Sequence, residues 1–291
     1  MKTNLCFKEV NSDSSSYPSR LLDLPNPPPV LYIAGEIVPS DSLALAVVGS
    51  RKMSSYGEDV CEEIVSQVSQ AGVTIVSGLM YGVDLTAHKV ALQAGGRTLG
   101  VLGFGKNFIH KVGDKNVVAQ MMEGAGAIIT EFGENEAGAP WTFPKRDRII
   151  SALASAILVV EAAEKSGTLY TIEAALKLKK EVMAIPGSIF SPVSKGTNKL
   201  IREGARLVCS VDEILEVLDV DSRIKKIAFK SEFPLSSAEN AILEVLKEGE
   251  LYIDDVAVKA NMVIYTVSAL LTSLELKGMV KDVGRGVYRR I

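Results

Sequence analysis

Three short segments of this 291-residue sequence each combine small and polar residues in a way that suits anion binding. Small residues let the backbone approach an anion, N–H groups at a helix start can donate to it, and an arginine can make a forked phosphate contact. Each segment alone also fits an ordinary tight turn between a strand and a helix. Together the three favour a ligand that bears phosphate. Their residues are Ser50 and Arg51, Gly78 and Gly82, and Lys165, Ser166 and Gly167.

The segment 140–150 adds aromatic rings to cations. It contains Trp141, the only tryptophan, together with Phe143, Arg146 and Arg148. We interpret it as a loop whose rings stack on unpaired bases and whose arginines contact backbone phosphates. The alternative is that the rings form a hydrophobic lid over a sheet and the cations are solvated. The helix dipole disfavours an arginine at a helix start unless an anion is close, which favours nucleic-acid binding.

Residues suited to catalysis or metal binding are few. The chain has two histidines, His88 and His110, and three widely spaced cysteines, so neither a zinc site nor a disulfide framework is indicated. The common nucleotide fingerprints and the GxSxG motif are absent. Glu131 and Glu161 end predicted strands and are expected to cap or order loops, while Asp84 is expected to be a helix N-cap. We therefore expect a protein that is not an enzyme and has no cofactor or metal.

The elements that must position these segments alternate along the chain. Apolar runs predict strands at residues 43–48, 73–76, 98–102, 127–130, 157–160 and 181–185. Helical spacing predicts helices at 57–71, 85–94, 115–123, 148–154 and 169–178. This alternation predicts an α/β fold, with a Rossmann-like doubly wound, mostly parallel sheet whose ligands bind at the carboxyl ends of the strands.

The remaining segments set the predicted domain boundaries. Residues 1–41 are rich in Ser, Pro and Asn and predict an N-terminal extended arm before a Rossmann-like DNA-binding domain at 42–218. Residues 219–235 predict a linker. Residues 236–291 show three helical patterns and a glycine-hinged pair of strands, which predicts a small C-terminal winged-helix domain. Its third helix carries no Lys or Arg between Val263 and Ser273, so we expect a weak duplex contact through the wing or a protein–protein role.

The overall composition limits how the chain could bind nucleic acid. The net charge is −3, so a DNA site must be a local cationic patch rather than a property of the whole surface. No apolar run approaches the roughly 20 residues of a membrane span, and the polar N-terminus does not fit a signal peptide. We expect a cytoplasmic protein.

A series of short motifs runs in a fixed order from about Tyr17 to Leu215. They are Val47-Val-Gly-Ser-Arg51, Ser77-Gly-Leu with Gly82-Val-Asp84, Phe143-Pro-x-Arg146-x-Arg148-Ile-Ile150, Val159-Val-Glu-Ala162, Lys165-Ser-Gly-Thr-Leu169, and Ile185-Pro-Gly187 with Gly196-Thr-Asn198. Their order and spacing closely resemble the DNA-processing protein A (DprA/Smf) family. Residues 242–290 resemble the winged helix of that family, so the resemblance covers nearly the whole chain.

The resemblance implies a bacterial protein that binds and protects single-stranded DNA during natural transformation and loads the RecA recombinase onto it. It also implies a homodimer formed through the Rossmann-like domain. Carried over onto this chain, the family's DNA pocket would be lined by Ser50, Arg51, Gly78, Gly82, Phe143, Arg146, Arg148, Lys165, Ser166, Gly167 and Asn198. In that pocket Phe143 would stack on a base and the cations would bind phosphates.

Some positions depart from the family pattern. Tyr81 stands where the family often has Arg, Asp147 where it has Asn, and Pro140 where it commonly has Lys. Each change removes positive charge or adds negative charge, so we expect weaker binding or a shifted strand path. In the loop after the third strand, Asn107 and His110 replace the usual Asp and Tyr.

Two other functions remain open from the sequence. One is a nucleotide N-glycosidase-like enzyme of a related Rossmann-like family, although the PGGxGT-type loop of such enzymes is absent. The other is a transcriptional regulator in which the first domain senses a nucleotide and the winged helix binds duplex DNA.

Overall fold

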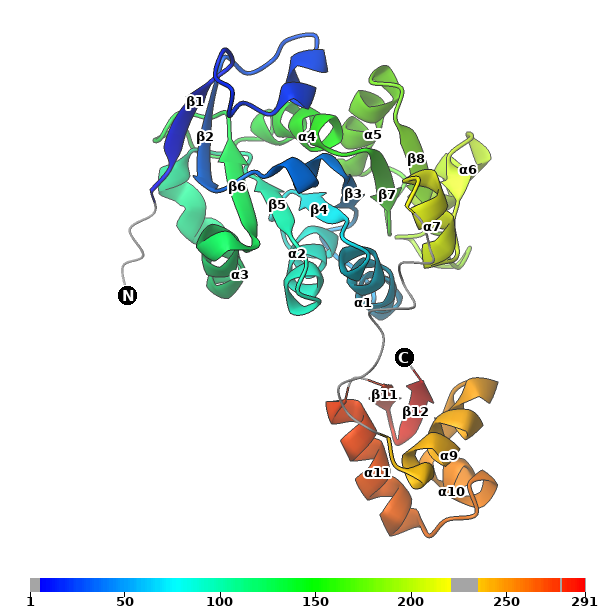
Figure 1. Ribbon diagram of the computed structural model, residues 1–291. Helices are drawn as coiled ribbons and strands as arrows, with labels where there is room; N and C mark the ends of the chain where they lie inside the picture. The colour runs from blue at the N-terminus through cyan, green and yellow to red at the C-terminus, as the bar shows by residue number, and fades with distance from the viewer. Residues whose placement is uncertain (1–5, 221–234, 278, 291) are drawn as a thin grey trace. The chain divides into compact units, whose positions relative to one another are not determined.

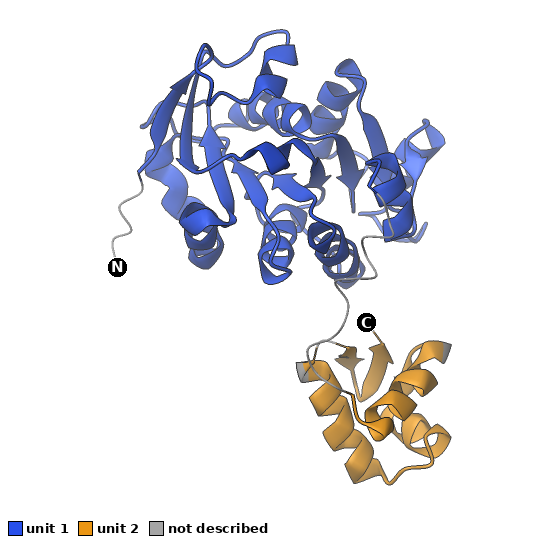
Figure 2. Cartoon of the chain, in the orientation of Figure 1, with its two compact units in different colours: residues 1–228 blue, residues 229–291 orange. Residues whose placement is uncertain are grey.

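The computed structural model describes residues 6–220, 235–277 and 279–290. The chain divides into two compact units, residues 1–228 and 229–291 (Figure 2). Most of the predicted linker, residues 221–234, lies outside the described residues.

The first unit is built on a nine-stranded sheet of order β1-β2-β6-β5-β4-β3-β7-β8-β9 (Figure 1). The strands from β6 to β9 in this order are parallel, and β1 and β2 run antiparallel to their neighbours. The strands are β1 (Lys8–Asn11), β2 (Val30–Gly35), β3 (Ala44–Val48), β4 (Thr74–Ser77), β5 (Thr98–Val101), β6 (Gly126–Thr130), β7 (Ala156–Val159), β8 (Glu181–Ala184) and β9 (Arg206–Leu207). The predicted α/β fold with a mostly parallel sheet is confirmed.

Helices cover both faces of this sheet (Figure 1). They are α1 (Ser55–Gln70), α2 (Val83–Gln93), α3 (Lys115–Gln120), α4 (Thr142–Leu153), α5 (Thr168–Lys177), α6 (Lys195–Arg202) and α7 (Val211–Val217). Shorter turns are the 3-10 helices η1 (Ser19–Asp23), η2 (Pro39–Ser42) and η3 (Lys106–Lys111) and the π-helical η4 (Met121–Ala125). The sequence patterns did not predict α6, β9 or α7.

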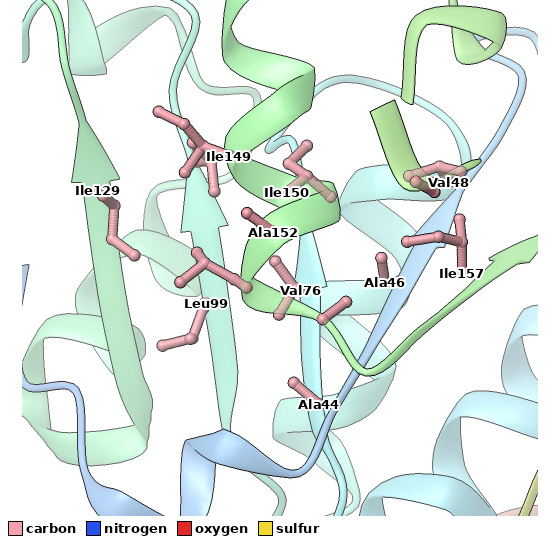
Figure 3. Close-up of a cluster of buried hydrophobic side chains, with 14 of the residues drawn as sticks. Ala44, Ala46, Val48, Val76, Leu99, Ile129, Ile149, Ile150, Ala152 and Ile157 are labelled. Carbon is pink, nitrogen blue, oxygen red and sulfur yellow. The ribbon is translucent and has the colours of Figure 1, made fainter. Parts of the chain in front are cut away.

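The two faces form separate hydrophobic clusters because side chains alternate along each strand. On β3, Ala44, Ala46 and Val48 pack on the side of α4 and α5, whereas Leu45 and Val47 pack on the side of α1 and α2. Figure 3 shows the first cluster, in which Ile149 and Ile150 of α4 lie against side chains of the sheet. All five residues of β3 are buried, as expected for a central parallel strand.

The expectation that residues 1–41 form an extended arm is wrong for the described part. Strand β1 pairs with β2, and β2 pairs with β6, so this segment extends the sheet by two strands. Tyr17, Leu21 and Leu31 are buried in the cluster on the α4 side. The segment is rich in proline and serine, yet its apolar run Val30–Gly35 forms β2, the strand that pairs with both β1 and β6.

Helix α4 starts six residues before the predicted position, at Thr142 instead of Arg148. Pro144 does not prevent this, because N–H groups in the first turn of a helix have no intrahelical acceptor. The first turn is closed by Thr142, whose Oγ1 accepts from the N–H of Ala139 at 3.0 Å. Phe143 and Arg146 therefore lie on a helix rather than in a loop.

The second unit is a winged helix, as predicted. It contains α9 (Ser237–Val245), the 3-10 helix η6 (Leu246–Glu248), α10 (Ile253–Lys259) and α11 (Ile264–Leu276). Its three-stranded sheet has the order β10-β12-β11, from β10 (Leu251–Tyr252), β11 (Val280–Gly284) and β12 (Val287–Arg290). Arg285 and Gly286 have positive φ angles of 58° and 75°, which form the tight turn at the tip of the wing.

No single helix in the described part of the chain is long and apolar enough to span a membrane. One bent pair, Ile253–Lys259 with Ile264–Glu275, meets the length and composition criteria together, with an angle of 108° between its helices.

Candidate nucleic-acid interface

A pocket of about 700 Å³ lies at the carboxyl edge of the parallel strands. The loops after β3 and β7 and the first turns of α4 and α5 line it. These elements meet because β3 and β7 are neighbours in the sheet, although about 110 residues separate them in the sequence. The predicted site residues that line it are Ser50, Arg51, Phe143, Arg146, Lys165, Ser166 and Gly167.

Glu161 orders the loop after β3. Its carboxylate accepts from the backbone N–H of Ser54 at 2.8 Å and from the Ser54 hydroxyl at 2.5 Å. Its backbone carbonyl accepts from the N–H of Ser50 at 2.7 Å. Glu161 is only 1% exposed, so these bonds are shielded from water. The predicted loop-ordering role of Glu161 is confirmed, and the loop presents Arg51 to solvent.

Gly78 and Gly82, the glycines predicted to bind an anion, do not line the pocket but pack behind Arg146 and Arg51, which do. Gly82 has a φ of +80°, and a Cβ there would lie 2.8 Å from the Cα of Arg51. A Cβ at Gly78 would lie 2.7 Å from Cζ of Arg146. Both positions need glycine because neighbouring segments pack against their backbone.

Arg51 and Phe143 form the centre of the pocket's rim. The Arg51 guanidinium carbon lies 5.1 Å from the centroid of the Phe143 ring, within range of a cation–π contact. Phe143 is half-buried and Arg51 is exposed. Lys52 and Lys165 are exposed as well, and no ion pair of Arg51, Lys52 or Lys165 exists among the described residues. The rim therefore carries three cations that are available to a ligand.

Arg146 does not provide the phosphate contact that the sequence predicted. It is 4% exposed, and its Nε donates to Oδ1 of Asp147 at 2.9 Å. Its Nη1 donates to the carbonyl oxygens of Gly78 at 2.6 Å and Val101 at 2.7 Å. A buried guanidinium needs such partners, because desolvation without them would be very costly. Arg146 thus ties α4 to β4 and β5 beneath the pocket.

Two carboxylates, the half-buried Asp84 and the buried Asp147, lie close to Arg146. Burial raises the pKa of Asp84 to about 6, against the lowering influence of the Arg146 guanidinium. Burial also raises the pKa of Asp147. Asp84 is the second residue of α2, and Gly82 occupies the N-cap position, so the N-cap prediction for Asp84 is wrong. Asp147 neutralises Arg146, so its carboxylate adds no unpaired negative charge to the pocket that it helps to line.

His88 of α2 is packed against β5, as expected for a lone helical histidine. It is fully buried, and its Nδ1 lies 2.6 Å from Oγ1 of Thr98. Burial lowers the pKa of His88 to about 3, with a smaller contribution from the nearby Arg146. No cluster of three or more metal-ligating side chains exists among the described residues.

Arg148 and Asn198 lie outside the lining of this pocket, contrary to the prediction. Arg148 donates to Glu131 at 2.5 Å and to the carbonyl of Asn26 at 2.7 Å. Asn198 bonds the backbone of Gly187 through both atoms of its amide, at 3.2 and 2.9 Å, and so fixes the loop after β8.

The pocket also has lining residues that were not among the predicted site residues, and Lys52 and Tyr170 are two of them. Lys52 follows Arg51 directly and could have been found from that position. Tyr170 gave no sequence signal, because only the packing of α5 turns it outward. Of the departures from the family pattern, Pro140 and Asp147 line the pocket, whereas Tyr81 lies elsewhere and packs over Gly113.

Comparisons with known proteins cover both units. Residues 8–219 match the family described as DNA recombination-mediator protein A, and residues 228–284 match the DprA winged helix domain. Protein Smf of Escherichia coli strain K12 is 37% identical over 301 residues, which cover 99% of this chain and 80% of that protein. The DNA processing protein DprA of Bacillus subtilis strain 168 is 36% identical over 207 residues, covering 70% of this chain and 69% of that protein.

Two solved structures share the fold. DprA from Streptococcus pneumoniae aligns with a TM-score of 0.67 and 35% identity over 72% of this chain and 74% of that one. DNA processing protein A from Helicobacter pylori, described for its single-stranded DNA binding mode, aligns with a TM-score of 0.66 and 25% identity over 76% of this chain and 100% of that one. From the family match over residues 8–219 and the identity to Protein Smf, the chain belongs to the DNA recombination-mediator protein A (DprA/Smf) family.

Proposed function

We propose that this protein binds single-stranded DNA in the pocket around Phe143 and acts in DNA processing. The observation that carries the proposal is the rim of exposed Arg51, Lys52 and Lys165 beside a half-buried aromatic ring. Cations that follow a backbone and a ring that stacks on bases are the usual components of sequence-tolerant single-strand sites. The Helicobacter pylori relative, whose single-strand binding is described, supports the same assignment.

Seven of the predicted residues have a role in this proposal. Arg51 and Lys165 neutralise phosphates, and Phe143 stacks on a base. Ser50, Ser166 and Gly167 line the pocket with small groups, so a strand can approach the backbone at the start of α5. Arg146 acts indirectly, by fixing the position of α4.

Family membership supports a further part of the proposal. We infer that the protein loads the RecA recombinase onto the bound strand during natural transformation, and that it does so as a cytoplasmic homodimer without catalysing a reaction. RecA filament assembly on protected single strands, measured with and without this protein, tests the loading step. Light scattering of the purified protein tests the dimer.

Titration against single strands, duplexes and mononucleotides tests the binding function. We expect single strands to bind best, and Arg51→Ala and Lys165→Ala each to weaken binding several-fold. Lys89→Ala, at an exposed position on α2 outside the pocket, is the matched control and should bind like the wild type. Release of free base from a nucleotide would instead favour the glycosidase-like alternative. Preference for one duplex sequence would favour the regulator.

A further inference from the structure

A second pocket adjoins the first on the surface between α4 and α5. It has a volume of about 430 Å³, and Pro144 and Tyr170 line both pockets. Tyr170 is 51% exposed and stands where the two hollows meet. A ligand that leaves the first pocket past Tyr170 therefore enters the second.

One face of α5 forms the floor of this second pocket. Tyr170, Glu173, Ala174 and Lys177 line it, at the i, i+3, i+4 and i+7 positions that share a helix face. The N-terminal segment, which the sequence suggested was an extended arm, contributes residues 24–26.

Helix α4 supplies the opposite wall, which one hydrogen bond and two ion pairs hold in place. Arg148 donates to the carbonyl of Asn26 at 2.7 Å and so joins α4 to the N-terminal segment. Glu131 accepts from Arg148 and lies 3.2 Å from Nζ of Lys145. The N-terminal segment and α4 thus form one fixed wall.

The charges that line the second pocket favour an anionic ligand. Its cations are Lys145, Arg148 and Lys177, of which Lys145 and Arg148 share the carboxylate of Glu131. Glu173 is the one carboxylate among the described lining residues. Lys177 is exposed and makes no ion pair in the described part of the chain. Because the rim of the first pocket is also cationic, the positive lining continues from one pocket into the next.

We propose that the second pocket is a continuation of the DNA site. The strand that occupies the pocket around Phe143 passes over Tyr170 and places its following phosphates on Lys177 and Lys145. This inference rests on the proposed function, and it assigns to the N-terminal segment and α5 a part in the path of the strand.

Lys177→Gln and Lys179→Gln form a matched pair of variants that tests this path. Lys177 is the last residue of α5 and Lys179 lies two residues beyond it; both are exposed, but Lys179 lines neither pocket. Binding of oligothymidylates of increasing length is measured against salt. For strands long enough to reach the second pocket, we expect Lys177→Gln to reduce the slope of log K against log salt by about 0.7, the value for one lost phosphate contact on a single strand. Lys179→Gln and strands too short to pass Tyr170 should show no change.

A third variant is expected to change the affinity for longer strands in the opposite direction. Glu173→Gln removes the carboxylate from the second pocket, so we expect longer strands to bind more tightly and the shortest strands to be unaffected. If binding depends on Arg51 but not on Lys177 or Glu173 at any strand length, the second pocket is not part of the DNA path, and the proposed function still stands. Wild-type protein that binds no single strand at all would overturn both.

Discussion

Two arginines of the site show how residue type and residue role can diverge. Arg51 is exposed, contacts the ring of Phe143 and has no carboxylate partner among the described residues. Arg146 is buried, and its hydrogen bonds to Asp147, Gly78 and Val101 lie within the protein. Loss of the first charge should affect DNA binding, whereas loss of the second should affect folding.

Arg146→Met therefore should destabilise the protein by about 3–5 kcal/mol, because it leaves the Asp147 carboxylate and two carbonyls without their partner. Urea unfolding followed by circular dichroism measures this loss. Arg51→Met is the control, and we expect its unfolding free energy to stay within about 0.5 kcal/mol of the wild type. Equal stability of the two variants would contradict the internal role of Arg146.

His88 predicts a dependence of stability on pH. Burial lowers its folded-state pKa to about 3, below its ordinary value of 6.5, so only the unfolded state takes up the proton between these values. The His88 contribution to stability is complete above pH 6.5 and is lost as the pH falls toward 3, by about 1.4 kcal/mol per pH unit. Asp84, with a raised pKa of about 6, has the opposite sign, since its contribution is lost as the pH rises through this value.

Comparison of wild type with His88→Gln isolates the histidine term, because Asp84 and the other carboxylates are common to both proteins. We expect the difference in unfolding free energy between them to change with pH between 6.5 and 3. A difference that is constant over this range would contradict the prediction.

At the scale of elements, the site depends on how loops are fastened to strands and helices. Glu161 at the end of β7 fixes the loop after β3, and the early start of α4 places Phe143 and Arg146 on a rigid helix. A pocket built from helix starts and fastened loops is preorganised for its ligand, which lowers the entropic cost of binding.

The variant Glu161→Ala tests whether Glu161 orders the loop after β3. The loss of negative charge and the loss of loop order predict opposite changes in single-strand affinity. Removal of a carboxylate next to a DNA site would strengthen binding on electrostatic grounds alone. We expect weaker single-strand binding, because Ser54 loses two hydrogen bonds and the loop that carries Arg51 loosens, together with a stability loss of about 1–3 kcal/mol. Glu161→Gln, which retains an acceptor, should lose less of both. Tighter binding by the Ala variant would contradict the loop-ordering role.

At the scale of the molecule, a chain of net charge −3 presents a local cationic rim. Asp147, an acidic residue that lines this pocket, is buried and paired with Arg146. The local field at the pocket therefore differs in sign from the charge of the whole chain, and a strand bound there would meet this local field.

Binding of a short strand should accordingly weaken with salt despite the net negative charge. If Arg51, Lys52 and Lys165 each neutralise one phosphate, the slope of log K against log salt is about −2. Fluorescence anisotropy at several salt concentrations measures it. Arg285→Gln, at the exposed tip of the wing in the second unit, should leave the slope unchanged. A slope near zero would exclude phosphate contacts at the rim.

Much of the fold was predictable because short apolar and glycine-containing sequence patterns mark its strands and turns. Apolar runs located the six strands from β3 to β8, and the glycine-hinged strands located the wing. The strand β2 was missed because its partner, β6, lies about 95 residues away and proline-rich sequence surrounds it. The early start of α4 was missed because Pro144 suggested a loop, although the first turn of a helix tolerates proline.

The sequence by itself determined the alternation of strands and helices, and hence that Ser50, Arg51 and Lys165 lie at one edge of a parallel sheet. Only the tertiary structure decided which cations a ligand can reach. Arg146 is held by the carbonyls of Gly78, just after β4, and Val101 of β5. Arg148 is turned toward Glu131, whereas Arg51 and Lys165 remain exposed. The physical reason is that an ion pair depends on side chains brought together from distant segments, and a local pattern carries no record of them.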